Sequence, residues 1–312
     1  MPVGDATLRA ALQDALQRPV RTLTRRAHLY GSSHAIEDVA VTFDDGPPLA
    51  LVLKDVSAPG PHAQAAKPLS LRDPDRELQA YVDVLGPAGL DVPVCYGALA
   101  EAGRRWLILE AVDGVPLWQL AEDAIWDETA RWLAGLHGHP APSRSLRLLR
   151  YDVPCFRNAL ARAVALTPTG ALDGVADIWE RVVARLTAWP RSIVHGDFYP
   201  SNILVQRRAA ATPRIRPVDW ELAGTGPGLL DLAALTAGSW SAAERERLTL
   251  TYGRALPAAL RPAPADLLDA LAHCRLFVAV QWLGWSRDWT APPEHAHDWL
   301  GEATALAWEL AP

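Results

Sequence analysis

The chain has 312 residues, of which 50% are hydrophobic, and its 36 acidic residues outnumber its 30 basic residues. Such a composition is typical of a globular protein that forms one bilobal unit or two domains. The net charge of −6 and the absence of a basic run argue against nucleic acid as the main partner, because phosphate binding needs clustered basic residues. Only Lys54 and Lys67 are lysines and neither follows a glycine, so a Walker A phosphate loop is excluded.

Cysteine usage and apolar runs bear on the compartment. Cys95, Cys155 and Cys274 lie far apart and form no Cys-x-x-Cys pair, which favours reduced thiols and a cytoplasmic location. No stretch approaches the roughly 18 apolar residues of a membrane span, and the first residues lack the apolar core of a signal peptide. We therefore expect a protein that is neither exported nor inserted in a membrane.

The first third of the chain predicts a small sheet with a leading helix. Leucines four apart predict an amphipathic helix over 5–17. Two β-prone runs, 40–43 and 49–54, flank an Asp-Gly turn and predict a hairpin whose second strand ends at Lys54. The composition of 56–69, which contains Lys67, predicts a loop.

A second helix and two more strands complete this part. Asp73 and Pro74 are typical of an N-cap and a first helical position, so a helix is expected from there to Gly86, with Glu77 at the border of its apolar face. The runs 92–96 and 106–112 predict two further strands, in a mostly antiparallel sheet. We place the domain boundary near Asp113, which gives domains 1–112 and 113–312.

The second domain is expected to be mostly helical. Helical periodicity is clearest over 126–136, 175–189, 242–256 and 266–282. The exception is a predicted hairpin whose strands are 203–206 and 215–218.

Polar residues concentrate beside this hairpin. Asp197 and Asn202 are five apart, the spacing of a phosphoryl-transfer loop in which Asp accepts the acceptor proton and Asn holds Mg²⁺. Asp219 ends the second strand, where such a site requires its metal-binding Asp. Oxygen ligands of this kind suit a hard cation that also binds nucleotide phosphates.

The motif His-Gly-Asp-x-x-x-x-Asn at 195–202, followed by Asp-Trp-Glu at 219–221, is similar to that of a known family. With Lys54, Glu77 and Gly-Pro-Gly-Leu-Leu-Asp at 226–231 in matching order, the chain resembles the aminoglycoside phosphotransferase and choline kinase superfamily of small-molecule kinases. The resemblance covers roughly residues 20 to 235. It implies an α+β, protein-kinase-like bilobal fold with a small antiparallel-sheet N-lobe and a larger, mostly helical C-lobe.

The resemblance also implies roles for single residues. Lys54 would contact the α and β phosphates of ATP while paired with Glu77. Asp197 would orient or deprotonate the acceptor hydroxyl, and Asn202 and Asp219 would bind Mg²⁺. These residue types suit a loose phosphoryl transition state, which needs positioning and charge neutralisation.

The nucleotide would have two further contacts. Backbone groups from Glu110 to Val112 would hold the adenine edge. No Gly-x-Gly-x-x-Gly precedes Lys54, so the candidate phosphate cover is Gly31, Ser32 and Ser33. The lack of the His-Arg-Asp, Asp-Phe-Gly and Ala-Pro-Glu motifs disfavours a protein kinase.

Other polar residues have structural interpretations beside the functional ones. Asp75 and Glu101 are weaker rivals of Glu77 as partners of Lys54. His195 is expected to bond the backbone or Asp219, and Asp231 to cap a helix or to hold the 195–202 loop. The His-Ala-His-Asp run at 295–298 is read as a solvated loop rather than a metal site.

Five tryptophans, at 282, 285, 289, 299 and 308, fall in the last 31 residues. Core packing explains most of them, and the alternative is an aromatic wall of the acceptor site. Residues 232–312 contain nine acids and six arginines. This excess of acids is smaller than we expect of a site that binds a polycationic aminoglycoside.

The sequence therefore predicts an ATP- and Mg²⁺-dependent phosphotransferase whose acceptor is a hydroxyl of a small molecule such as a sugar, cyclitol, amino alcohol or antibiotic. GTP remains open as the donor. One alternative is an aminoglycoside O-phosphotransferase. An alternative of another class is a catalytically silent nucleotide-binding protein that uses the kinase fold as an interaction module.

Overall fold

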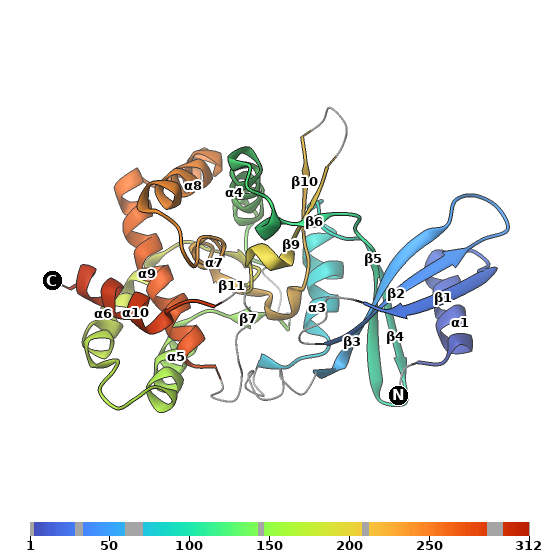
Figure 1. Cartoon of the computed structure of the whole chain (residues 1–312), viewed down its shortest axis with the longest axis horizontal. Coiled ribbons are helices and arrows are strands. Elements are labelled where there is room, and N and C mark those ends of the chain that lie inside the picture. Colours follow the sequence, from blue (N-terminus) through green and yellow to red (C-terminus); the bar gives the residue numbers. More distant parts are fainter. Residues whose placement is uncertain are drawn as a thin grey trace. The chain divides into compact units, whose positions relative to one another are not determined.

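The computed structural model describes residues 3–28, 34–59, 71–142, 147–207, 212–285 and 296–311, and structural statements below refer to these residues. The chain divides into unit 1, Met1–Asp113, and unit 2, Gly114–Pro312 (Figure 1). This division falls one residue after the expected limit of 112.

Unit 1 is built on a five-stranded antiparallel sheet in the order β1-β2-β3-β5-β4. Its strands are β1 (Thr22–Ala27), β2 (His34–Thr42), β3 (Leu49–Pro59), β4 (Cys95–Glu101) and β5 (Arg104–Glu110). The predicted hairpin is present as β2 and β3, and Gly46 takes a φ of 75° in the connection, a conformation that glycine adopts without strain.

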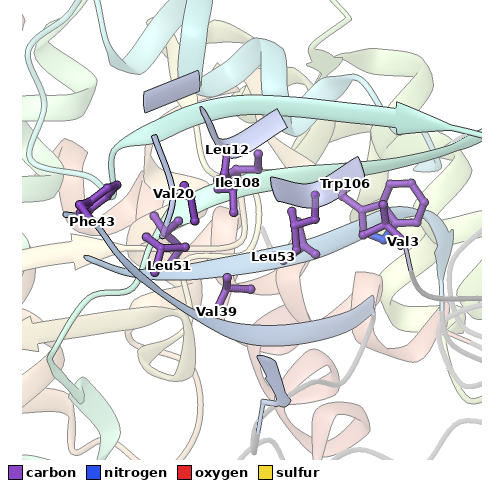
Figure 2. Close-up of a cluster of buried hydrophobic side chains, with 11 residues drawn as sticks. Val3, Leu12, Val20, Val39, Phe43, Leu51, Leu53, Trp106 and Ile108 are labelled. Carbon is purple, nitrogen blue, oxygen red and sulfur yellow. The ribbon is translucent and has the colours of Figure 1, made fainter. Parts of the chain in front are cut away.

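The core of unit 1 lies between the sheet and helix α1 (Asp5–Leu16), close to the predicted helix 5–17. Figure 2 shows alternate residues of β3 and β5, including Leu51 and Leu53, in the same buried cluster as Leu12 of α1. Because side chains alternate across a strand, burial of Leu51 and Leu53 against the helix directs Val52 and Lys54 to the opposite face of the sheet. The apolar pattern of β3 thus decides which face of the sheet carries its lysine.

The second helix of unit 1 begins later than predicted. The residue at its N-cap position is Asp75 rather than Asp73, and Oδ1 of Asp73 accepts the amide of Asp75 at 3.0 Å in the turn that precedes the helix. Helix α3 spans Arg76–Gln79 and continues as a π-helical turn, η2 (Ala80–Leu85). The amide of Gly86 then closes an i→i+5 bond, so the helix ends where the sequence predicted.

Strand β4 also differs from its predicted range of 92–96. The pairing register with β5 shifts between Cys95 and Gly97, and Gly97 has a φ of 130°. Such an irregularity interrupts the regular pairing with the neighbouring strand near the start of β4. The strand begins at Cys95 and continues to Glu101.

Unit 2 is mostly helical, as predicted. Its helices are α4 (Asp123–Gly138), α5 (Val153–Leu166), α6 (Asp173–Ala188), α7 (Leu229–Leu235), α8 (Ala242–Ala255), α9 (Pro264–Leu283) and α10 (Trp299–Glu309), with single 3₁₀ turns η3 (Leu117–Gln119), η4 (Pro200–Asn202), η5 (Trp220–Leu222) and η6 (Ala258–Leu260). Helix α9 is apolar on most sides and packs against α5, α6, α7, α8 and α10. Within the described part of the chain, no helix is both long and apolar enough to cross a membrane.

Two small sheets in unit 2 position the polar motifs. One has the order β10-β9-β6 and consists of β6 (Val115–Pro116), β9 (Ile203–Gln206) and β10 (Arg214–Pro217). The other has the order β7-β11-β8 and consists of β7 (Leu149–Arg150), β8 (Arg191–Val194) and β11 (Gly224–Pro227). The predicted hairpin is β9 and β10, in which Ile203 pairs with Pro217. The 195–202 loop therefore connects β8 of one sheet to β9 of the other.

Candidate active site

Lys54 and Glu77 form a buried ion pair in unit 1. The Lys54 ammonium on β3 lies 2.6 Å from Oε2 of Glu77 on α3, and the two side chains are only 5% and 2% exposed. Separating two buried charges of this kind would leave each of them uncompensated away from water, which is strongly unfavourable. The pair therefore fixes the lysine at one place over the sheet.

The two rival acids have other partners. Asp75 pairs with Arg105, and Glu101 accepts a hydrogen bond from the Thr7 hydroxyl at 2.8 Å. Glu77 is thus the glutamate that the fold brings to Lys54.

Some of the groups at the end of β5 that were predicted to contact the nucleotide already form hydrogen bonds within unit 1. The amide of Glu110 donates to the Val94 carbonyl at 2.8 Å, and the Glu110 carboxylate accepts the Val94 amide at 3.0 Å. Val112 follows the strand and is half-buried. Its amide is a better candidate than that of Glu110 for an external hydrogen bond. Gly31, Ser32 and Ser33, and also Lys67, lie outside the described residues.

In unit 2, Asp231 on α7 holds the start of the 195–202 loop. Its carboxylate accepts the amide of His195 at 2.7 Å and the amide of Gly196 at 2.9 Å, and it is 1% exposed. Nε2 of His137 on α4 lies 3.2 Å from the same carboxylate. Each carboxylate oxygen thus binds a backbone N–H, and such charge-assisted bonds are stronger than neutral ones. Of the two predicted roles for Asp231, holding the loop is the one observed.

His195 connects the loop to the end of β10. Its ring is fully buried, and Nδ1 accepts the amide of Asp197 at 3.2 Å, which leaves Nε2 to donate to the Val218 carbonyl at 3.0 Å. The Trp220 ring packs against the imidazole at a centroid distance of 4.3 Å. His195 therefore has the structural role that the sequence predicted, and its ring bonds the backbone, which is one of the two partners expected for it.

Asp197 and Asn202 contact each other across the loop. Nδ2 of Asn202 donates to the Asp197 carbonyl at 2.9 Å and to its Oδ2 at 3.1 Å. The Val218 amide donates to the Asn202 carbonyl at 2.9 Å, so Asn202 and Asp219 lie at the same end of the hairpin. Asp219 itself has a φ of 65°, a left-handed conformation that is uncommon outside glycine and clusters at functional sites.

The donor atoms at this hairpin end fit a magnesium ion that also binds phosphates. No group of three or more His, Cys, Asp or Glu residues lies together within the described ranges, so no full protein cage is found there. Asn202 and Asp219 offer amide and carboxylate oxygens, and Mg²⁺ commonly takes one or two protein ligands together with substrate phosphates. The 295–298 run is different, because Asp298 caps α10 and His297 contacts Glu302 at 2.6 Å. His295 lies outside the described residues.

Tyr151 supports the loop and has no motif of its own in the sequence. Its hydroxyl donates to the Leu222 carbonyl at 2.9 Å. A Cβ added to Gly196 or Gly224 would overlap the tyrosine, and Gly196 has a φ of 82°. The available signal was the pair Gly224 and Gly226, both of which lie against Tyr151, because closely spaced glycines indicate a close approach of another group. His137, the other supporting residue that sequence reasoning missed, gave no comparable signal.

A stack of aromatic side chains from α9, from the residues just after it and from α10 reaches the same loop through Trp282. Trp282 donates from Nε1 to the hydroxyl of Tyr199, and its ring stacks on Trp285 at 5.3 Å and on Trp299 at 5.1 Å. Burial, and next the charge of Asp197, raise the pKa of Tyr199 far above its usual value, so this hydroxyl stays neutral. Trp308 is 85% exposed and stands apart from the stack, and Trp289 lies outside the described residues.

These features define a phosphoryl-transfer fold, and comparison with known proteins identifies the family. A model of the phosphotransferase enzyme family matches residues 36–267. The chain therefore belongs to this family, which confirms the predicted enzyme class, a phosphotransferase. No curated protein sequence matches the chain at a significant level.

Solved structures of small-molecule kinases share the fold. An ethanolamine kinase of Plasmodium vivax is 14% identical with a TM-score of 0.64, covering 98% of this chain and 87% of the kinase. A microcompartment-associated aminopropanol kinase is 15% identical with a TM-score of 0.63 and coverages of 97% and 95%. The GDP complex of aminoglycoside 2'-phosphotransferase-IIIa is 14% identical with a TM-score of 0.60 and coverages of 98% and 98%. The predicted protein-kinase-like fold is confirmed.

Proposed function

We propose that the enzyme transfers the γ-phosphoryl group of ATP, with Mg²⁺, to a hydroxyl of a small molecule. The observation that carries this proposal is the geometry of Asp197. Its carboxylate is held by Asn202 within a loop whose backbone amides bind the buried Asp231. Asp219 lies at the neighbouring end of the β9–β10 hairpin. The proposed proton acceptor, Asp197, and the two proposed metal ligands, Asn202 and Asp219, therefore lie on the loop and the hairpin that follows it.

In the proposed reaction Asp197 accepts the proton of the acceptor hydroxyl. The oxygen then forms a bond to the γ phosphorus as the bond from that phosphorus to the bridging β oxygen breaks, and ADP leaves. Asn202 keeps Oδ2 of Asp197 in place through its Nδ2 donation. A positioned general base of this kind accelerates proton transfer by about 10²- to 10⁴-fold.

Two groups of residues would bind the phosphates, one directly and one through Mg²⁺. Lys54, positioned by Glu77, would contact the α and β phosphates, and Asn202 and Asp219 would hold Mg²⁺. When bound, the ion neutralises charge on the phosphate oxygens. The Glu110–Val112 segment would hold the base, and Gly31, Ser32 and Ser33 remain the sequence candidates for covering the phosphates.

The acceptor would lie against the aromatic stack. Trp282 connects this stack to Tyr199, two residues after the proposed base. Flat aromatic faces bind the apolar faces of sugar rings and amines. The excess of nine acids over six arginines in 232–312 is small, which supports a neutral or weakly cationic acceptor over a polycationic aminoglycoside.

A coupled assay of ADP or GDP formation tests the proposal. The acceptor panel is sugars, cyclitols, amino alcohols, aminoglycosides and nucleosides, each with MgATP and with MgGTP. Turnover should require one acceptor class and Mg²⁺ and should fall at least about 10²-fold in Asp197→Asn. Asp177→Asn, at an exposed position of α6, is the matched control and should retain full activity.

The silent-module alternative predicts a different result. It predicts no turnover with any acceptor, and a thermal shift with nucleotide that does not depend on Mg²⁺. That pair of results would replace the proposed enzyme activity by nucleotide binding alone.

A further inference from the structure

A cavity lies within unit 2, on residues that the proposed reaction does not use. It has a volume of about 280 Å³ and lies between the end of α4, the start of β8, the end of α8 and the η6 turn. The lining residues on which the argument depends are His137, His139, Trp189, Arg191, Tyr252 and Leu260.

The polar lining of this cavity is basic. Arg191 is exposed, and it donates to the carbonyls of Tyr151, at 3.3 Å, and Thr225, at 2.9 Å, which are both neutral acceptors. His139 adds a half-buried imidazole. Among the described residues that line the cavity, none is acidic. Asp231 lies beyond His137, and its carboxylate is directed to the loop amides. The charge therefore suits an organic anion.

The remaining walls are flat and apolar. Trp189 is half-buried and contributes aromatic surface, Tyr252 is buried at the cavity wall, and Leu260, which is 40% exposed, lies on the η6 turn. The volume is slightly below the roughly 300 Å³ at which ordinary ligand sites begin, so the ligand is small, on the order of ten non-hydrogen atoms. One ring with one carboxylate matches both the size and the charge.

A chain of hydrogen bonds connects the cavity to the 195–202 loop. Nδ1 of His137 lies 2.9 Å from the Tyr252 hydroxyl, and Nε2 lies 3.2 Å from Asp231, which binds the His195 amide. The His137 ring has little room, because a Cβ added to Gly228 would overlap it. A ligand that moves or fixes Tyr252 therefore acts on the group that holds the loop.

Strand β8 provides a second connection. Arg191 lines the cavity at the start of this strand, and the strand ends at Val194, directly before His195. A ligand that orders the Arg191 end changes the freedom of the same four-residue strand that leads into the loop.

We propose that this cavity is a second ligand site that binds an aromatic monocarboxylate, and that its occupant changes the mobility of the 195–202 loop through His137 and Asp231. The site goes beyond the proposed transfer reaction, and its binding can be measured without any turnover.

Saturation-transfer NMR on the full chain tests the site with benzoate, and with benzylamine as a ligand of the same size and opposite charge. Benzoate should bind saturably and at least fivefold more tightly than benzylamine. Leu260→Trp, which fills the mouth of the cavity, should weaken benzoate binding at least tenfold. Val164→Trp places the same ring at a half-exposed position of α5 outside the cavity and should leave binding unchanged.

His139→Glu offers a test that does not depend on filling the cavity. It should weaken benzoate binding, whereas His139→Gln, which adds no charge, should weaken it less. Absence of saturable benzoate binding would overturn the site. Equal binding of benzylamine, or benzoate binding that survives both Leu260→Trp and His139→Glu, would overturn it as well.

Hydrogen exchange tests the connection to the loop. Saturating benzoate should change the exchange rates of the His195 and Gly196 amides at least twofold in the wild type and leave them unchanged in Leu260→Trp. Benzoate binding without that change would refute the coupling. None of these readouts requires an acceptor or a nucleotide, so their failure is distinct from failure of the proposed phosphotransferase function.

Discussion

The ammonium of Lys54 lies 2.6 Å from Oε2 of Glu77, and both charges are almost completely removed from water. The chain contains only one other lysine, Lys67, in a segment rich in alanine and proline. Nearly all basic residues of the chain are arginines, yet the buried partner of Glu77 is a lysine, whose ammonium is compact. Arginine there would present a larger, planar group with a different set of donors.

We predict that Lys54→Arg lowers kcat/KM for MgATP by about 10²-fold, because the guanidinium cannot occupy the ammonium position without displacing Glu77 or the phosphates. Steady-state kinetics at varied nucleotide concentration measure this change. Lys67→Arg is the matched control and should leave the kinetics unchanged. Near-normal nucleotide kinetics in Lys54→Arg would show that the position needs only a positive charge.

Removing the charge should affect folding as well as nucleotide use. Lys54→Met leaves Glu77 buried without its ammonium partner, and breaking such a pair costs about 3–5 kcal/mol. Urea unfolding should show this loss as a lower midpoint. The double variant Lys54→Met with Glu77→Leu removes both charges and should regain much of the free energy of unfolding. A double variant no more stable than the single one would contradict the assignment of this cost to the unpaired carboxylate.

The hairpins and the 195–202 loop were accessible from sequence because local patterns determine them, whereas the pairing of Lys54 with Glu77 was implied only by the family resemblance. Strand alternation predicts where Lys54 points, and the spacing of Asp197 and Asn202 needs only one loop to bring them together. The late start of α3 was not accessible, since Asp73 satisfies the sequence rule for an N-cap yet bonds Asp75 in a preceding turn.

Long-range partners were also beyond sequence reasoning. His137 reaches Asp231, 94 residues further along the chain, and a histidine near the end of a helix has no pattern that names such a partner. The loop is held by contacts between α4, α7 and β8, and these depend on how the helices pack rather than on any one segment.

Gly196 should tolerate no side chain. A Cβ would overlap the Tyr151 hydroxyl and the Leu222 carbonyl, and the φ of 82° is strained for any other residue. Left-handed strain costs about 1–3 kcal/mol and overpacking about 1–3 kcal/mol more. We predict that Gly196→Ala loses at least about 2 kcal/mol of unfolding free energy, measured by urea denaturation, together with most of the activity.

Gly174 provides the control for that substitution. It is the second residue of α6 and has nothing near the position of an added Cβ. Gly174→Ala should therefore stabilise the protein by about 0.5–1 kcal/mol, through the lower backbone entropy of alanine in the unfolded chain. Opposite signs for the two glycine variants would support the close approach at Gly196. Equal effects would contradict it.

The thiols of Cys95 and Cys155 should react slowly in the folded protein. Burial, with a smaller contribution from the nearby charge of Glu77 for Cys95 and of Asp152 for Cys155, outweighs the lowering by a backbone hydrogen bond and raises the pKa of each to about 11. Only the thiolate reacts, so at pH 8 iodoacetamide should modify these cysteines far more slowly than it does in urea, where the pKa returns to about 8.5. The modification rate in the folded state should keep rising with pH up to about 11.

The same shifts make the free energy of unfolding fall at high pH. Between about pH 8.5 and 11 the folded thiols retain protons that the unfolded chain has lost, so each raised pKa removes about 1.4 kcal/mol per pH unit across that interval. Urea midpoints measured from pH 8 to 10.5 should therefore decline less steeply in the Cys95→Ala, Cys155→Ala double variant than in the wild type. Identical slopes, or folded-state thiols that titrate near pH 8.5, would contradict the burial of these two side chains.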